Sequence, residues 1–574
     1  MEWILLGTWF LLIIAGLYFV FPKAGRKSWE ALVPVYNMVV WLKVIQKPWW
    51  WIFLLIFPGV NILMISIMSV NTGTVFAKQE PSDVAKFGFF PFIFLFLLGR
   101  EENLKYVGPI DRTKFKKTQA QEWRDAILFA VVAASIIRTY FMEAFMIPTS
   151  SMEKSLLRGD FLFVSKAAYG PKIPQTPLAF PFFHHSFPLT NGTVKSYTDW
   201  IKLPYYRLPG LGTIERNDVV VFNYPAGDTV DTDLQSTVNF TQLVMQNANI
   251  YRIQDYLSKG KIKSDKVYED RARKQLIRNN SLTIRPVDKK EHFIKRCVAI
   301  AGDEVSIKNK QLFVNGEAAE NPEGLQYNYI VETENGRLTN ARAEGNATNA
   351  QMMFKDQYNI DVEDQNNGKK LGGGKYILPM SQATADEMSQ DATIKSVTPL
   401  IDEKDTLNTS SLHDALYMFG NDQASAMRYL NGYQYKYDDL YPNRFIYPNT
   451  RSVDWTQDNY GPIWVPKSGE SIALNDQNYT VYYRVITAYE HNTLERKEDG
   501  IYLNGEKASE YTFKMNYYWL MGDNRHSSQD SRFWGFVPED HVVGKASMVW
   551  FSFDKERGLF DGKIRWDRLF TVVD

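Results

Sequence analysis

The chain has 574 residues, too many for one ordinary domain, so we expect two to four structural units. It carries 65 basic and 65 acidic residues, and this balance gives no electrostatic reason to expect nucleic acid as a partner. The single cysteine, Cys297, excludes an intrachain disulfide. Hydrophobic residues are concentrated in the first quarter of the chain, which points to a membrane region there.

Four apolar runs in this first quarter are candidate membrane spans. They lie at residues 3–21, 49–70, 87–98 and 126–145. The first is too long and uninterrupted for a signal-peptide core, and the second opens with three tryptophans, as expected of an interfacial belt. The third has only about a dozen residues, which suits a tilted span or a re-entrant segment equally. We therefore predict three to four transmembrane helices.

The distribution of basic residues predicts the orientation of these spans. Five lysines and arginines lie within residues 23–47 and seven within 100–124, but only two within 71–86. Basic loops stay in the cytoplasm, so the N-terminus and everything after residue 147 are expected outside. The predicted localisation is the cytoplasmic (inner) membrane, with several passes and with the large C-terminal part on the extracytoplasmic, or periplasmic, side.

Beyond residue 147 the sequence alternates between β patterns and polar insertions. Segments typical of a strand, some preceded by a turn, lie at residues 156–164, 215–225, 292–300, 481–485 and 547–553. Asn-Gly pairs at 315–316 and 504–505 predict tight hairpin turns. Two polar stretches, at about 228–290 and 318–478, interrupt the pattern, and residues 265–278 have helical character.

These observations predict four segments. They are a membrane region at 1–146, the first part of a β domain at 147–317, an inserted cap-like domain at 318–478, and the second part of the β domain at 479–574. The predicted fold class is an N-terminal α-helical transmembrane region plus a mainly-β extracytoplasmic domain that carries a large mixed α/β insertion.

No pattern in the sequence predicts a metal or cofactor. His184 and His185 lack a third ligand at a suitable spacing, so we interpret them as a surface pair. The acidic cluster at 361–364 lacks the ligand pattern and glycine of an EF-hand loop, which favours a solvated loop. There is no His-Glu-x-x-His and no Walker A motif, so zinc protease and nucleotide hydrolase activities lack support.

Ser151 lies where the last apolar run is expected to leave the membrane, but a serine hydroxyl becomes a nucleophile only beside a base. Residues 148–152, Pro-Thr-Ser-Ser-Met, are the first of four segments that resemble the conserved boxes of bacterial type I signal peptidase (leader peptidase). The other three are residues 216–225, Lys295-Arg296 with Gly302-Asp303, and 522–532. Their order is that of the family, and together they cover most of the outer part outside the insertions. The resemblance implies a signal-peptidase-like β fold.

The resemblance also implies a Ser-Lys dyad, in which Ser151 is the nucleophile and Lys295 the general base. A lysine with its ordinary pKa of about 10.4 is protonated at neutral pH, so this amine must be desolvated to accept a proton. Side chains alternate along a strand, and Phe293 and Cys297 therefore share the face of Lys295.

Further roles follow from the matched positions. Thr149 and the backbone N–H of Ser151 correspond to the family's oxyanion hole, which stabilises the charge that develops on the carbonyl oxygen. Ser528 corresponds to the residue that orients the lysine amine. Positions implied as structural support are Met521, Asp523, Arg525, Asp530 and Arg532.

One position departs from the family pattern. The family usually has proline two residues after the methionine of its Ser-Met pair, and this chain has Lys154. The change creates Ser151-x-x-Lys154, the spacing of penicillin-binding proteins and β-lactamases, but their Ser-Asp-Asn and Lys-Thr-Gly elements do not occur here. A histidine base is disfavoured because the matching position is Lys295, and His526 lies where the family is variable.

The function implied by the resemblance is that of a membrane-bound serine endopeptidase that removes signal peptides from exported preproteins. It is expected to cut after small residues at the first and third positions before the scissile bond. Shallow pockets for them are expected beside Ser151, lined by Ile147, Phe161 and Ile294, with the substrate bound as an added strand. Expected partners are preprotein signal peptides, the lipid bilayer and the secretion machinery, with no nucleic acid and no cofactor.

Two alternatives stay open. The first is a Ser-Lys protease of the same superfamily that is dedicated to one secreted substrate, such as a pilin or a conjugation factor. The second is an inactive membrane scaffold that binds a partner through the insertion at 318–478. The size of that insertion is the reason to keep the first, and the presence of both Ser151 and Lys295 argues against the second.

Overall fold

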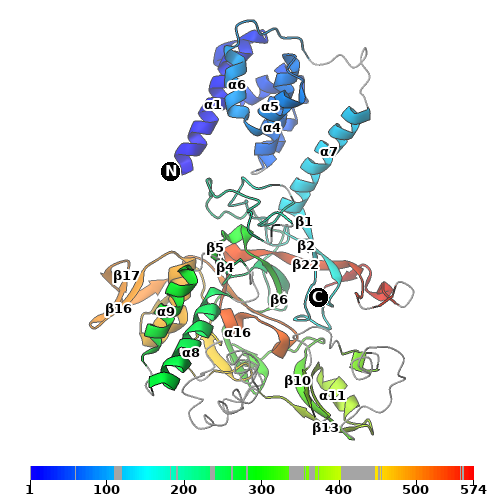
Figure 1. Cartoon of the computed structure of the whole chain (residues 1–574), viewed down its shortest axis with the longest axis vertical. Coiled ribbons are helices and arrows are strands. Elements are labelled where there is room, and N and C mark those ends of the chain that lie inside the picture. Colours follow the sequence, from blue (N-terminus) through cyan, green and yellow to red (C-terminus); the bar gives the residue numbers. More distant parts are fainter. Residues whose placement is uncertain are drawn as a thin grey trace. The chain divides into compact units, whose positions relative to one another are not determined.

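The computed structural model describes most of the chain (Figure 1). The described residues are 2–57, 60–108, 119–180, 182–188, 190, 192–232, 239–259, 263–278, 282–334, 354–355, 357–360, 369–372, 374–401, 446–449, 453, 455–555, 557–558 and 562–573. The chain divides into two compact units. We call Met1–Glu143 with Gly170–Pro209 the helical unit, and Ala144–Tyr169 with Gly210–Asp574 the β unit.

The helical unit contains seven of the described α-helices. They are α1 Glu2–Lys23, α2 Tyr36–Val44, α3 Trp51–Leu54, α4 Val60–Val75, α5 Pro81–Phe89, α6 Pro91–Arg100 and α7 Gln119–Ile136. Glycines let α1 and α6 approach closely, because a Cβ on Gly99 would lie 2.5 Å from Phe19 Cβ. Trp41 is fully buried, and its indole N–H donates a hydrogen bond to Thr72 Oγ1 at 2.7 Å.

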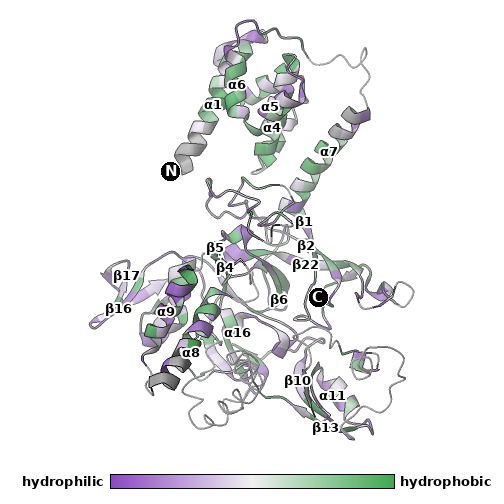
Figure 2. Cartoon of the chain, viewed as in Figure 1, coloured by the Kyte–Doolittle hydropathy of each residue, from purple (hydrophilic) through white to green (hydrophobic). Residues whose placement is uncertain are grey.

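Hydrophobic residues dominate helices such as α4 and α6 (Figure 2). Within the described residues, however, none of the individual helices combines the length and the hydropathy needed to cross a membrane. The pair α5 and α6 meets both requirements only when taken together, and it bends by 116° at its break.

The prediction of one continuous span over residues 126–145 is wrong at its end. α7 ends at Ile136, a π-helical turn follows over Ile137–Phe141, and Met142–Met146 form strand β1. Exposure alternates at the start of β1, where Glu143 is buried between two exposed neighbours, as in a strand. Arg138 Nε donates to the Glu143 carboxylate at 2.6 Å, so this pair lies at a helix-to-strand junction.

The core of the β unit is an eight-stranded sheet with the order β1-β2-β22-β3-β6-β20-β21, and β23 pairs with β22. Its further strands are β2 Asp160–Ser165, β3 Val219–Asn223, β6 His292–Ala299, β20 Tyr517–Met521, β21 Val537–Pro538, β22 Val542–Ser552 and β23 Thr571–Val572. Strands β2, β22, β3, β6 and β20 pair antiparallel in turn. This order brings residues near 151, 295 and 521 into one region although they are far apart in the sequence.

The first polar stretch forms a helical hairpin, α8 Phe240–Lys259 and α9 Asp265–Arg278, flanked by the paired strands β4 Thr229–Asp231 and β5 Leu282–Ile284. The prediction of a helix over residues 265–278 is therefore confirmed. Tyr268 and Ala272 of α9 are buried in a cluster of their own with Leu243 and Val244 of α8.

The second insertion contains a sheet with its own apolar core. We call strands β11 Lys369–Gly372, β12 Lys375–Met380, β10 Tyr327–Thr333 and β13 Ile394–Pro399, with helix α11 Gln382–Met388, the inserted sheet. Val331, Leu378 and Met388 are buried at its centre. The acidic cluster at 361–364 lies outside the described residues.

Smaller sheets complete the β unit. They are formed by β14 Tyr460–Trp464 with β7 Glu304–Lys308, β8 Gln311–Val314 and β9 Glu317–Ala318, by β15 Ser471–Ala473 with β19 Glu510–Thr512, and by β16 Leu494–Lys497, β17 Gly500–Leu503 and β18 Glu506–Lys507. Both predicted Asn-Gly turns are confirmed. Asn315 and Gly316 have φ of 54° and 82°, and Asn504 and Gly505 have 52° and 90°, the left-handed pair that such hairpins require.

The strand predicted at residues 481–485 is wrong, because helix α15, Asp476–Arg484, occupies most of that segment. The Asn475 side chain caps this helix by accepting a hydrogen bond from the Asn478 N–H at 2.8 Å. Val481 and Tyr482 are buried, and Val485 follows one turn after Val481 in the same apolar cluster. The β-branched and aromatic residues that suggested a strand thus form the buried face of a capped helix.

Candidate active site

Ser151 and Lys295 lie together in the β unit although 144 positions separate them. Ser151 is in the turn between β1 and β2, and Lys295 is on β6. Lys295 Nζ lies 2.7 Å from Ser151 Oγ and 2.9 Å from the Ile294 carbonyl oxygen. Only 9% of Ser151 and 3% of Lys295 are exposed. A serine hydroxyl and an amine are therefore in hydrogen-bond contact in a nearly dry environment.

Burial changes the protonation of this amine. Desolvation lowers the pKa of Lys295 from 10.5 to about 8, and the carboxylates of Asp530 and Asp523 offset part of the shift. Val220 of β3 lies opposite Lys295 in the sheet, and Val220, Phe293 and Cys297 belong to one apolar cluster. The centre of the Phe293 ring is 5.7 Å from Lys295 Nζ. A neutral amine is thus accessible near physiological pH.

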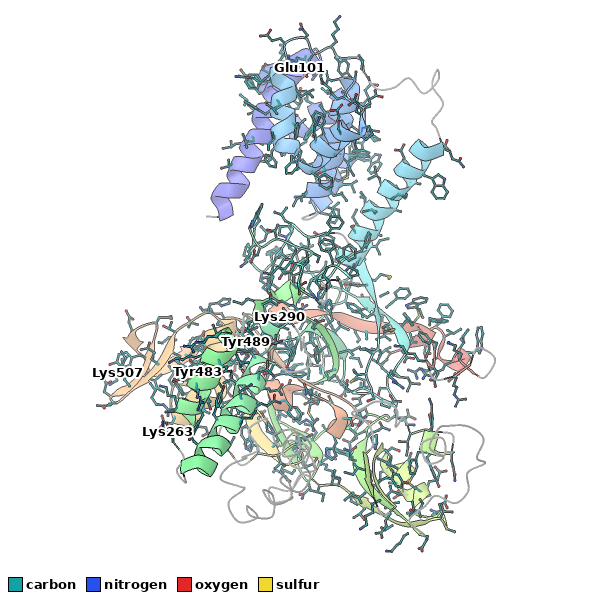
Figure 3. The ribbon with its side chains drawn as sticks, in the orientation of Figure 1. Glu101, Lys263, Lys290, Tyr483, Tyr489 and Lys507 are labelled. Atoms are coloured by element: carbon teal, nitrogen blue, oxygen red, sulfur yellow. The ribbon has the colours of Figure 1, made fainter. Side chains whose placement is uncertain are left out.

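A buried lysine with a low pKa is not by itself a base for catalysis, as Lys290 shows. Burial lowers its pKa to about 8 as well. Its amine lies 3.0 Å from His541 Nε2, and the centre of the His541 ring is 5.7 Å from that of the Tyr489 ring. Lys290 and Tyr489 are labelled in Figure 3. What distinguishes Lys295 is the serine hydroxyl at hydrogen-bond distance.

The turn that carries Ser151 is fixed from both sides. Met152 and Leu156 are fully buried, and the Leu156 N–H donates to the Met152 carbonyl at 2.7 Å. Asn524 donates its side-chain N–H to the Ser150 carbonyl and its backbone N–H to the Ser151 carbonyl, each at 3.2 Å. Within the described part of the chain, the backbone N–H of Ser151 donates no hydrogen bond. Thr149 beside it is exposed.

An ion pair links Asp523 to the strand of Lys295. Arg296, the next residue on β6, donates from Nε at 3.0 Å and from Nη2 at 2.9 Å to the Asp523 carboxylate, and both side chains are buried. Ser155 Oγ donates to the same carboxylate at 2.5 Å. Asp523 therefore holds the Ser151 turn and β6 together.

A second buried ion pair shapes the loop that follows. Arg532 donates from Nε and Nη2 to the two oxygens of Asp530, at 2.9 and 2.8 Å, and the Gly522 N–H donates to Asp530 Oδ2 at 3.1 Å. The Arg525 carbonyl accepts from Arg532 Nη2 at 2.5 Å. Attraction to Arg532 keeps the pKa of Asp530 below its usual value despite the burial.

We expect Asp530→Asn to lower the free energy of unfolding by about 3–5 kcal/mol, because it leaves the buried Arg532 charge without its partner. Denaturation of the full chain in detergent measures this. The matched control is Lys507→Ala, at a residue labelled in Figure 3, which breaks an exposed ion pair with Asp499 at 3.3 Å. The control is expected to change stability by less than about 1 kcal/mol. Equal effects of the two substitutions would contradict the structural role of the buried pair.

Ser528 packs beside Ser151 across Gly522. A Cβ on Gly522 would lie 2.2 Å from Ser528 Oγ and 2.5 Å from the Ser151 carbonyl oxygen. The buried Ser528 hydroxyl has no hydrogen-bond partner among the described residues. Its orientation of the Lys295 amine therefore stays a prediction. Met521 lies opposite Arg296 in the sheet, and its side chain belongs to the apolar cluster that contains Trp519 and Tyr517.

The residues considered as alternative bases or ligands have other contacts. Lys154 Nζ donates to the Asn359 carbonyl at 2.6 Å, and His526 Nε2 lies 2.9 Å from Asp458 Oδ1. The rings of His184 and His185 are 5.5 Å apart in the helical unit. The described residues contain no group of three or more His, Cys, Asp or Glu side chains able to hold a metal ion.

Sequence reasoning missed how much of the site is held by contacts to the insertion. Asn524 lies within the family-like segment 522–532, where a supporting role is expected, but its hydrogen bonds to the carbonyls of Ser150 and Ser151 follow only from the folded arrangement. The contacts of His526 with Asn328 and Asp458 join segments whose separation in sequence gives no signal of proximity.

A serine hydroxyl beside a desolvated amine, on an antiparallel sheet, is an arrangement suited to nucleophilic catalysis by a serine hydrolase with an amine base. The chain belongs to the signal peptidase family, peptidase S26. The sequence model of that family matches residues 120–366 and 464–551. A second model, for a family of unknown function (DUF5684), matches residues 29–109.

Individual relatives match over shorter stretches. A protein of Haemophilus influenzae named signal peptidase I is 32% identical over 124 residues, which are 22% of this chain and 34% of that protein. Proteins of the same name from Buchnera aphidicola subsp. Schizaphis graminum and Aquifex aeolicus are 50% identical over 57 residues and 44% identical over 59. Each match covers 10% of this chain, and 18% and 21% of the relative. The chain thus spans about a third or less of the length of these relatives.

Proposed function

We propose that the protein is a membrane-bound serine endopeptidase that removes signal peptides from exported preproteins. The observation that carries the proposal is the 2.7 Å between Ser151 Oγ and Lys295 Nζ in a chain of this family. In the proposed reaction the neutral Lys295 amine takes the Ser151 proton while Oγ attacks the scissile carbonyl carbon. The resulting ammonium then protonates the leaving amine, and an ester links the signal peptide to Ser151. A water molecule, deprotonated by the same amine, hydrolyses this ester.

The negative charge on the substrate carbonyl oxygen needs hydrogen-bond donors. The backbone N–H of Ser151 is a suitable donor because it donates no other hydrogen bond in the described part of the chain. The Thr149 hydroxyl, exposed two residues earlier, is proposed as the second donor. Such donors each contribute roughly 3–4 kcal/mol to transition-state stabilisation in well-studied proteases.

Substrate specificity is proposed to depend on apolar surface beside Ser151. Ile147 and Ile294 belong to one apolar cluster with Met152, the residue after the nucleophile, which supports their place in pockets for small side chains. Phe161 instead packs on Trp550, Phe551 and Phe553, so its contact to substrate has less support. The substrate is proposed to bind extended, as an added strand.

A row of aromatic rings supports the lipid bilayer as a partner. Phe161, Phe163, Trp550, Phe551 and Phe553 lie on β2, β22 and just beyond, with ring centres 5.6–6.2 Å apart along the row, and all are only partly buried. The apolar runs and basic loops of the first quarter support a place in the cytoplasmic membrane, with the β unit outside. We propose preproteins, lipid and the secretion machinery as partners, and these observations support the lipid among them.

The direct test uses purified full-length protein in detergent and a labelled preprotein with alanine at the first and third positions before the cut. We expect cleavage by the wild type at that bond and no cleavage by Ser151→Ala. Ser471→Ala is the matched control, because Ser471 is exposed on β15, and it is expected to cut at the wild-type rate. Cleavage of one dedicated substrate but of no ordinary preprotein would favour the specialised protease. Undiminished cleavage by Ser151→Ala would overturn the proposed mechanism.

The pKa of Lys295 predicts the pH dependence of this reaction. Because the base must be neutral, and burial places its pKa at about 8, kcat/KM is expected to rise with pH and to level off above about 8. At pH 6 the neutral fraction, and with it kcat/KM, is expected to be about 100-fold below the plateau. A pH–rate profile with a short peptide substrate measures this. A profile that is flat from pH 6 to 9 would exclude an amine base with this pKa.

A further inference from the structure

His526 joins the loop that carries Ser528 to the insertion. It lies in the 3-10 turn Arg525–Ser527, two residues before Ser528. The N–H of Asn328, on β10 of the inserted sheet, donates to His526 Nδ1 at 3.1 Å. His526 Nε2 lies 2.9 and 3.1 Å from the two carboxylate oxygens of Asp458, and the side chains of His526 and Asp458 are 5% and 0% exposed.

These two contacts fix the imidazole ring. Nδ1 accepts a hydrogen bond, so it carries a lone pair, and the ring proton is on Nε2, where it donates to Asp458. Turning the ring over would direct carbon atoms at both partners and leave a buried carboxylate without this donor. Each such loss costs roughly 1–3 kcal/mol, so one ring orientation is strongly preferred.

The loop at 522–532 is held between the beginning and the end of the insertion. At the beginning, the Gln326 N–H donates to the Asp523 carbonyl, and the Arg525 N–H donates to the Gln326 carbonyl, both at 2.9 Å. At the end, the Tyr447 N–H donates to the Arg532 carbonyl at 2.7 Å. His526 is a side chain that contacts both parts at once.

The same insertion also contacts the turn that carries Ser151. Lys154 Nζ donates to the Asn359 carbonyl at 2.6 Å. Gly324 packs so closely that a Cβ on it would lie 2.6 Å from Ser155 Oγ. The turn that carries Ser151 and the loop at 522–532 are therefore both attached to one insertion. Some of the residues that the insertion contacts, such as Lys154, lie outside the family-like segments.

We propose that His526 is a positioning residue for the proposed cleavage reaction, and the inference rests on that proposed function. Its hydrogen bonds to Asn328 and Asp458 hold the turn at residues 525–528 against the insertion. These contacts thereby determine the positions at which Ser528 and Gly522 pack against Ser151. The Ser528 hydroxyl has no hydrogen-bond partner among the described residues, so the backbone of this turn determines its place. The insertion thereby takes part in holding the catalytic geometry.

The test compares His526→Ala with two conservative variants in the full chain. His526→Asn offers an acceptor to the Asn328 N–H, and His526→Gln offers a donor to Asp458. We expect His526→Ala to lower kcat about 10–100-fold with KM within about twofold, and the conservative variants to recover part of that loss. His491→Ala, an exposed histidine of the β unit, is the matched control and should keep the wild-type kcat.

Two further measurements separate positioning from general destabilisation. Amide hydrogen exchange should accelerate at residues 522–528 in His526→Ala but stay unchanged in α9. In a double-mutant cycle, His526→Ala and Asp458→Ala should be strongly non-additive in kcat. Unchanged kcat, additive effects, or faster exchange throughout the β unit would overturn the proposal. If the wild type cuts no preprotein, the proposed function fails, and local exchange at 522–528 still tests the lock by itself.

Discussion

Lys295→Ala is expected to lower the rate of preprotein cleavage by at least about 10⁴-fold, because nucleophile and base act as one unit. Without the amine, Ser151 keeps its proton at neutral pH, and no other described side chain is hydrogen-bonded to its hydroxyl. Single-turnover cleavage of a labelled preprotein at pH 8 measures the loss. Lys295→Met, which keeps the volume of the side chain, is expected to show the same loss.

This loss does not require unfolding. Since burial lowers the pKa of Lys295 to about 8, its charged form is disfavoured in the folded protein. That penalty is fully present below pH 8 and fades between about pH 8 and 10.5, where the unfolded chain binds the extra proton. Lys295→Met removes the penalty, so its melting temperature at pH 7 should equal or exceed that of the wild type.

Lys154→Ala is the control that separates the two lysines. It removes a hydrogen bond to the Asn359 carbonyl but no contact to the Ser151 hydroxyl, so cleavage is expected within about threefold of the wild type. Loss of activity in Lys154→Ala together with full activity in Lys295→Ala would assign the base to the Ser-x-x-Lys pair instead.

Much of the candidate site could be predicted from the sequence because its residues occur in short segments that follow one another in the order of the family. The alternation of a strand predicted correctly that Lys295 has apolar neighbours, and the register opposite Val220 is consistent with it. The turns at Asn315-Gly316 and Asn504-Gly505 and the helix Asp265–Arg278 were likewise fixed by local chemistry. In each of these cases, residues close in the chain decide the conformation.

Where tertiary contacts override the local pattern, predictions from the sequence were wrong or could not be made. Residues 142–146 are apolar enough to continue a helix, yet they pair with β2. Residues 481–484 have strand-forming side chains, yet the Asn475 cap and a buried face make them helical. The contacts of Lys154 with Asn359 and of His526 with Asp458 span 205 and 68 positions, and neither polar pair has a local pattern that would reveal it.

Gly522→Ala is expected to lower kcat about 10²–10³-fold with little change in KM, because misplacing reacting groups by about 1 Å costs roughly 10²-fold. The added Cβ would lie 2.2 Å from Ser528 Oγ and 2.5 Å from the Ser151 carbonyl oxygen, well inside van der Waals contact. Gly522 cannot retreat freely, since its N–H donates to the buried Asp530. The strain must therefore be relieved by movement of Ser151 or Ser528.

The matched control is Gly212→Ala, also in the β unit, where the nearest atom to the new Cβ would be 3.9 Å away. It should keep the wild-type kcat and melting temperature. Steady-state cleavage of a short peptide, with melting temperatures of both variants, distinguishes a displaced nucleophile from a destabilised fold. A drop in kcat with a melting temperature within a few degrees of the wild type identifies displacement. A wild-type kcat in Gly522→Ala would mean that the turn carrying Ser151 can shift without loss of activity. That result would contradict a Ser151–Lys295 dyad whose catalysis depends on the position of this turn.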